Sequence, residues 1–143
     1  MASWAQGRVF KVALDREKAE RLRAEARALD MVGGGTVVQL RSDPRELGGR
    51  TPLELEYAGE RTPGARLGAD GTLSYHELER YGGDLFTALD QLAAKGVRHR
   101  DLKPDTFGPY EPSARTWQLM LLDFSLADAS DRDIKAGTRG YVR

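Results

Sequence analysis

The sequence predicts an α+β fold in which a small β-rich part, residues 1–59, precedes a largely helical part, residues 60–143. Runs of β-branched and aromatic residues, which favour strands, fall in the first part. The longest stretch with helical periodicity falls in the second part. The segment 60–71 contains several glycines and a proline, and we interpret it as the loop that joins the two parts.

The first part is predicted to begin with a strand and a helix. Residues 8–14 (RVFKVAL) have the composition of a strand. In residues 16–31 apolar side chains recur every three or four positions, as on one face of an amphipathic helix. Asp15 is a suitable N-cap for this helix, and the triple glycine at 33–35 ends it. The apolar face consists of Ala19, Leu22, Ala26 and Leu29.

Two further strands are predicted before the boundary. They cover residues 36–40 (TVVQL) and 53–57 (LELEY), both of which carry strand-forming residues. The polar stretch 41–52 between them contains glycine and proline, so it is a loop or a hairpin connection.

The second part is predicted to contain one long helix and a short hairpin. The helix covers residues 73–95 and ends at Gly96, a residue that commonly stops helices. Strands are predicted near 106–108 and at 117–122, with a turn at 109–115. The apolar face of the helix consists of Leu78, Tyr81, Leu85, Leu89 and Leu92.

The composition excludes several classes of function. With 22 basic and 22 acidic residues the chain has no net field to attract nucleic acid or an anionic membrane. Without cysteine it can form neither a disulfide framework nor a thiolate metal site, and two histidines are too few for a His-rich site. No apolar run approaches the ~20 residues of a membrane span, and the N-terminus has no apolar signal core. We therefore expect a cytoplasmic protein with neither nucleic acid nor a membrane as partner.

Three short motifs in the last third of the chain carry the chemistry. They are residues 99–106 (HRDLKPDT), residues 123–125 (DFS) and residues 137–141 (GTRGY). In this order they resemble the catalytic loop, the metal-binding triplet and the end of the activation segment of eukaryotic-type serine/threonine protein kinases. The alternatives are a charged surface loop at the first motif and an ordinary strand end at the second. A chance match to all three motifs is hard to accept.

The predicted order of elements supports this resemblance. A kinase domain runs from its third strand through a helix, two strands, a long helix and the catalytic loop in the same order. The resemblance implies a kinase-like α+β fold, with a small antiparallel N-lobe part and hinge at 1–59 and a helical C-lobe part at 60–143. The DFS triplet, the long stretch 107–118 and the GTRGY motif are most similar to the large kinases of bacterial phage-growth-limitation (BREX-type) defence systems.

The resemblance also implies roles for residues of the catalytic loop and the triplet. Asp101 corresponds to the catalytic base, Lys103 to the lysine that contacts the transferred phosphate, and Thr138 to the threonine that bonds both. Asp123 corresponds to the Mg²⁺-binding aspartate. Thr106 stands where the family has asparagine as second metal ligand, and a hydroxyl is a weaker ligand than an amide carbonyl, so we expect reduced activity.

The remaining candidate site residues lie in the first part. The resemblance makes Lys11 the lysine that holds the ATP phosphates and Glu25 its helix partner, so we expect an ion pair that faces Asp123. The alternative is a surface lysine and a solvated glutamate. At the hinge, backbone groups of Glu56 and Ala58 are expected to contact adenine, which Val9 would cover.

The resemblance implies transfer of the ATP γ-phosphate to a serine or threonine of a protein substrate, with ATP and Mg²⁺ as cofactors. The segment before the Lys11 strand is too short for the first two kinase strands and the glycine-rich loop, and Arg143 precedes the later C-lobe helices. We therefore expect a domain truncated at both ends, with weak activity alone. Self-association or a partner chain would supply the missing elements. The alternative is a weak or inactive pseudokinase-like module that binds nucleotide or a protein.

Overall fold

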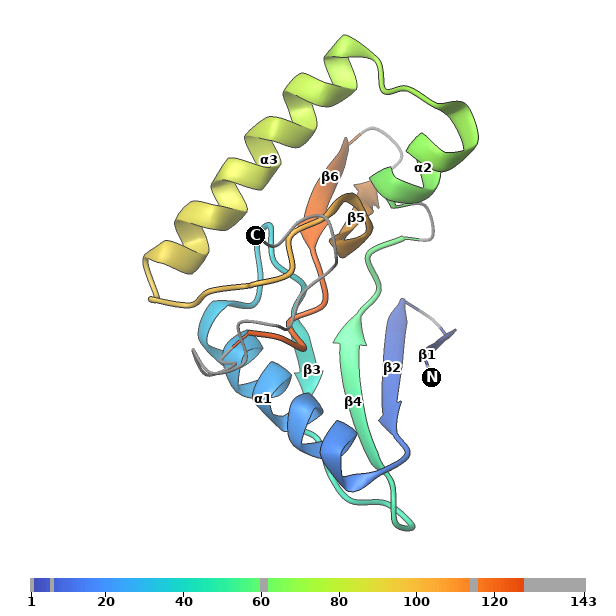
Figure 1. The fold of residues 1–143 in the computed structure, drawn as a ribbon, viewed down its shortest axis with the longest axis vertical. Coiled ribbons are helices and arrows are strands. Elements are labelled where there is room, and N and C mark those ends of the chain that lie inside the picture. Colours follow the sequence, from blue (N-terminus) through green and yellow to red (C-terminus); the bar gives the residue numbers. More distant parts are fainter. Residues whose placement is uncertain (1, 6, 60–61, 114–115, 128–143) are drawn as a thin grey trace.

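The computed structural model describes residues 2–5, 7–59, 62–113 and 116–127 of the chain (Figure 1). Thr138 and the GTRGY motif lie outside the described residues. A sheet with one covering helix forms the lower half of the view, and a long helix with a two-stranded hairpin forms the upper half. The predicted α+β class is therefore confirmed.

The sheet contains four antiparallel strands in the order β1-β2-β4-β3. One short strand, β1, precedes the Lys11 strand and pairs with β2 through all four of its residues. The sequence analysis did not identify this strand. The strands are β1 (Ala2–Ala5), β2 (Arg8–Ala13), β3 (Leu40–Ser42) and β4 (Thr51–Glu56).

Strand β4 shows why the sheet has two different faces. Its residues alternate between buried and half-buried positions, as expected when one face of a strand packs on a core. The buried positions are Thr51, Leu53 and Leu55, and the register places Lys11 opposite Leu53 and Val9 opposite Leu55. Lys11 and Val9 therefore lie on the same face of the sheet as the buried side chains of β4.

Helix α1 (Arg16–Val32) packs against β2, β3 and β4. Its start follows the prediction, because the Asp15 side chain accepts a hydrogen bond from the backbone N–H of Lys18 at 2.8 Å. Its end at Gly33 also agrees. The buried face contains the predicted apolar residues and, among them, the charged residue Glu25.

The predicted strand 36–40 was wrong in its position, since the strand begins only at Leu40. Val37 and Val38 are buried, but this segment lies beside Leu121 of the second part. The N–H of Val38 donates to the Leu121 carbonyl at 3.0 Å, and the N–H of Leu121 donates to the Thr36 carbonyl at 2.8 Å. The apolar run therefore links the two parts of the molecule.

The predicted loop 60–71 contains an unexpected helix, α2 (Pro63–Asp70). Thr62 caps it by accepting from the N–H of Ala65 at 3.0 Å, proline occupies its first turn, and Gly71 ends it with a positive φ of 75°. The long helix α3 (Tyr75–Ala93) follows the prediction and begins with a capping box formed by Ser74 and Glu77.

The hairpin of β5 (Phe107–Ser113) and β6 (Thr116–Leu121) follows a short 3₁₀ turn, η1 (Pro104–Thr106). Its strands are longer than predicted, because Pro109 pairs with Leu119 within the ladder instead of starting a turn. Strand β6 lies against α3, where Asp84 accepts a hydrogen bond from the N–H of Leu119 at 2.7 Å. Within the part of the chain that the structure describes, no helix combines the length and hydropathy needed to cross a membrane.

Candidate active site

Three charged side chains from distant segments meet on the inner face of the sheet. Lys11 of β2 lies 2.6 Å from Glu25 of α1 and 3.3 Å from Asp123, which follows β6. The distances join Lys11 Nζ to Glu25 Oε1 and to Asp123 Oδ1. The expected ion pair is therefore formed and faces Asp123, which excludes the alternative in which both residues are solvated surface charges.

Glu25 is held in a fully buried position, with no side-chain exposure. Its Oε1 atom also accepts a hydrogen bond from the backbone N–H of Phe124 at 3.1 Å. Among the described residues its Oε2 atom has no hydrogen-bond partner. One carboxylate oxygen thus joins Lys11 to the triplet that contains Asp123, and the charge on Glu25 depends strongly on Lys11 for compensation.

Lys11 and Asp123, the two partly exposed members of this cluster, are both charged at neutral pH. Burial would lower the pKa of Lys11, but the carboxylates of Glu25 and Asp123 outweigh burial, and the pKa of Lys11 is raised. Burial would raise the pKa of Asp123, but Lys11 and hydrogen bonds from Ser125 outweigh it, and the pKa of Asp123 is lowered. The Asp123 side chain is 41% exposed and can reach a ligand.

The raised pKa of Lys11 predicts a specific loss of stability in alkali. A lysine with a raised pKa in the folded state contributes stability that is complete below its unfolded pKa, about 10.5, and is lost as the pH rises through the folded value. The free energy of unfolding, measured in urea from about pH 9 upward, should therefore fall less steeply for Lys11→Met than for the wild type. Lys95→Met, at an exposed lysine, should keep the wild-type slope. Identical slopes in wild type and Lys11→Met would contradict the prediction.

The loop after α3 carries a second pair of charged residues. Asp101 is buried, and its Oδ2 atom lies 3.0 Å from Nζ of Lys103. The preceding residue, Arg100, has a φ of 69°, and Asp123 has a φ of 61°. Left-handed backbone is uncommon for residues other than glycine, asparagine and aspartate, and such positions concentrate at functional sites. Asp101 therefore follows a residue with left-handed backbone, and Asp123 has left-handed backbone itself.

His99 connects the two segments that carry these carboxylates. Its Nδ1 atom accepts from the N–H of Asp101 at 3.3 Å, so Nε2 carries the proton and donates to the Leu122 carbonyl at 2.7 Å. Burial lowers the pKa of His99, which keeps the ring neutral. The ring also packs edge-on against Phe124, with centroids 4.8 Å apart. His99 thus fixes the distance between the Asp101 loop and the residues around Asp123.

Thr106, which occupies the expected position of a second metal ligand, lies in the same loop. Its side chain is almost completely buried, and its hydroxyl contacts backbone groups of Asp101 and Lys103. This geometry does not support a metal-ligand role.

The expected adenine-contacting positions lie on β2, at the end of β4 and in the segment after β4. Val9 is half-buried opposite Leu55, and Ala58 is buried beside β5, where a Cβ atom at Gly108 would come within 2.7 Å of the Ala58 carbonyl. The N–H of Glu56 donates to the Gln39 carbonyl at 2.9 Å. These contacts fix the backbone of residues 56–58, while the proposed contacts with adenine stay a prediction.

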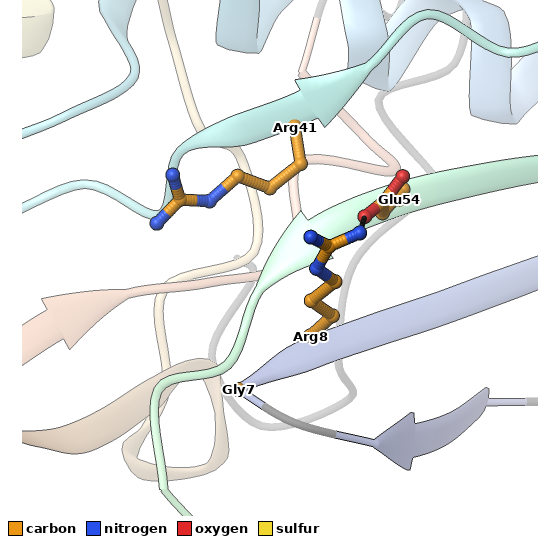
Figure 2. A pocket seen from close by; sticks show the side chains of 4 residues that line it. All are labelled: Gly7, Arg8, Arg41 and Glu54. Atoms are coloured by element: carbon orange, nitrogen blue, oxygen red, sulfur yellow. Dashed lines mark hydrogen bonds and ion pairs between the residues drawn. The ribbon is translucent and has the colours of Figure 1, made fainter.

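A pocket of about 360 Å³ lies elsewhere, on the opposite face of the sheet (Figure 2). Gly7, Arg8, Arg41 and Glu54 line it, and Arg8 points toward Glu54, with a nitrogen–oxygen distance of 2.9 Å. Arg8 and Lys11 are three residues apart on one strand, so their side chains point to opposite faces. The pocket is therefore separate from the Lys11 cluster.

The sequence analysis missed two polar residues that position this site. Gln91 of α3 donates from Nε2 to the carbonyls of Val32, at 2.5 Å, and Gly34, at 2.7 Å, and so holds the end of α1. Asp84 holds β6 from the same helix. Their seven-residue spacing places both on one side of α3, beside its apolar face. This spacing was the signal in the sequence that could have identified Asp84 and Gln91.

Comparison with known proteins agrees with the geometry of the site. No family model matches the chain. It is 37% identical to the "Probable kinase PglW" of Streptomyces coelicolor over 94% of its length, although it spans 10% of that protein. This similarity agrees with the resemblance to large bacterial kinases.

Two eukaryotic kinases are also similar. The chain is 30% identical to "CBL-interacting serine/threonine-protein kinase 3" of Arabidopsis thaliana over 90% of its length, and it spans 31% of that protein. It is 32% identical to "Calcium/calmodulin-dependent protein kinase type 1" of Macrobrachium nipponense over 63% of its length, and it spans 26% of that protein. Since the fold, the arrangement of charged residues and these three similarities agree, the chain belongs to the protein kinases and forms a partial kinase domain.

Proposed function

We propose that the chain binds Mg-ATP beside the Lys11 cluster and transfers the γ-phosphate to a serine or threonine hydroxyl of a protein. The single observation that carries this proposal is the meeting of Lys11, Glu25 and Asp123 on the inner face of the sheet. A kinase needs these three charges together, and they come from segments 14 and 112 residues apart in the sequence. We also propose that residues 1–59 act as the N-lobe part with the hinge, and residues 60–143 as the C-lobe part.

The donor set suits a magnesium nucleotide. Lys11 provides a fixed positive charge for phosphate oxygens, and the part-exposed Asp123 carboxylate is the hard oxygen ligand that Mg²⁺ prefers. When bound, Mg²⁺ neutralises charge that develops on the phosphate oxygens. Val9, Glu56 and Ala58 would then contact adenine.

The second pair of charges acts on the substrate. Asp101 would accept the proton of the substrate hydroxyl, and Lys103, at 3.0 Å, would hold the aspartate and contact the transferred phosphate. Thr138 is proposed to bond both residues. The equal numbers of basic and acidic residues support a protein substrate more than a nucleic acid.

Phosphate transfer tests the proposal directly. The protein as encoded is incubated with γ-labelled ATP and Mg²⁺, once with a generic basic protein and once alone. We expect label on serine or threonine and its loss when Mg²⁺ is removed with a chelator. Absence of label, or label that persists without divalent metal, would contradict the proposal.

A second candidate function is nucleotide binding without transfer. The observation that favours it is Thr106, whose hydroxyl bonds backbone groups of its own loop at a position where the family has a metal ligand. The two candidates differ in one result, because a binding module would bind Mg-ATP and leave the label on the nucleotide.

Substitution of Asp123 tests the binding step that both candidates share. Asp123→Asn should weaken Mg-ATP binding about 10-fold or more, since losing a charged partner costs about 1.5–3 kcal/mol. Titration calorimetry measures this change. Asp90→Asn, at an exposed aspartate on α3, is the matched control and should bind as the wild type does. Equal affinities for Asp123→Asn and the wild type would show that Asp123 is not used.

A further inference from the structure

The buried hydroxyl of Thr106 is surrounded by backbone groups of the loop that carries Asp101. The side chain is 1% exposed. Its Oγ1 atom accepts from the N–H of Lys103 at 3.1 Å, and it faces two carbonyls, that of Lys103 at 2.9 Å and that of Asp101 at 3.2 Å. A hydroxyl has one proton to donate, and these carbonyls share it. Both residues of the charged pair are thus bonded through their backbone to one side chain.

The backbone of Thr106 extends this arrangement to the strand before Asp123. The Thr106 carbonyl accepts from the N–H of Leu122 at 2.8 Å, and the Leu122 carbonyl accepts from His99 at 2.7 Å. His99 in turn accepts from the N–H of Asp101. These hydrogen bonds form a closed ring that joins the Asp101 loop to the end of β6. Thr106 takes part in it through both its backbone and its side chain.

We propose that Thr106 is a positioning residue, whose hydroxyl holds Asp101 and Lys103 in register with Asp123 and does not serve as a metal ligand. This inference rests on the proposed function, because the positioned groups are those that would perform phosphoryl transfer. Positioning matters strongly for this chemistry, since little covalent help is required from the protein.

Two variants separate positioning from metal binding. Thr106→Val keeps the shape of the side chain but removes the hydroxyl that accepts from the N–H of Lys103 and faces the two carbonyls, so the loop should shift. Thr106→Ser keeps the hydroxyl and should retain the arrangement. In the protein as encoded, we expect Thr106→Val to lower kcat about 100-fold, and Thr106→Ser to restore most of it.

The kinetic pattern identifies the role. If Thr106 is a positioning residue, KM for ATP and the Mg²⁺ concentration for half-maximal rate should stay at wild-type values in both variants. A metal ligand predicts that Thr106→Val requires a higher Mg²⁺ concentration. A wild-type kcat in Thr106→Val, or a shifted Mg²⁺ requirement, would overturn the proposal.

Amide hydrogen exchange provides a readout that does not depend on activity. In the wild type the Lys103 amide should be protected, since Thr106 accepts its proton. Exchange at Lys103 should be faster in Thr106→Val and unchanged in Thr106→Ser, while the Tyr57 amide, which donates to Gly7 at 3.1 Å, serves as the internal control. If the wild type transfers no phosphate, the proposed function fails, yet this comparison still decides the role of Thr106. An unprotected Lys103 amide in the wild type would overturn the positioning role of Thr106 even if Thr106→Val does not fold.

Discussion

Replacement of Asp101 by asparagine is expected to lower the rate of phosphoryl transfer about 100- to 10,000-fold, the usual contribution of a positioned general base. Asparagine has nearly the shape of aspartate and can still accept a hydrogen bond from Lys103, so the loop should keep its conformation. It cannot accept the proton of the substrate hydroxyl. The affinity for Mg-ATP should change little, because Lys11 and Asp123 lie in other segments.

A neighbouring aspartate provides the control for this variant. Asp105 belongs to the same loop, is exposed, and lies near Thr62 outside the cluster. Asp105→Asn should keep the rate within about 2-fold, because surface substitutions usually change free energies by less than about 0.5 kcal/mol. Initial rates with γ-labelled ATP measure both variants. A wild-type rate in Asp101→Asn would exclude Asp101 as the catalytic base.

Much of the fold could be predicted because its two main helices carry local signals. Helices α1 and α3 have apolar faces that repeat over several turns, and both have side-chain caps. The eight residues of α2 are too few for a periodic pattern. Thr62, Pro63 and Gly71 were nevertheless correct start and stop signals, and the glycine content of the segment concealed them.

The positions that could not be predicted depend on contacts between distant residues. The run Thr36–Val38 has the composition of a strand, yet its hydrogen bonds with Leu121 place it between the two parts. Sequence composition does not specify such a partner. In the same way, Gln91 and Asp84 bind backbone groups of remote segments, and nothing in the local sequence identifies those groups. The Lys11–Glu25 pair could be predicted only because the motifs near residues 101 and 123 gave the order of elements.

That pair is also where the largest effect on stability is expected. Lys11→Met should lower the free energy of unfolding by about 3 kcal/mol or more, since removal of one partner leaves a buried charge without compensation. Glu25 has no exposed side-chain surface, and its Oε2 atom has no hydrogen-bond partner among the described residues, so Lys11 is its main source of compensation. Urea unfolding measures the effect, and m-values should stay constant if the variant keeps two-state behaviour.

A double-mutant cycle distinguishes this explanation from a loss of packing by the lysine side chain. Glu25→Gln removes the buried charge, so the double variant Lys11→Met with Glu25→Gln should be more stable than Lys11→Met alone. A purely steric loss would leave the double variant at least as unstable. Arg21→Met is the control, because Arg21 and Glu17 form an ion pair of similar length, 2.8 Å, on the exposed face of α1. Exposed pairs contribute little to stability. If Lys11→Met costs no more than Arg21→Met, Glu25 does not require Lys11 for compensation, and the explanation is wrong.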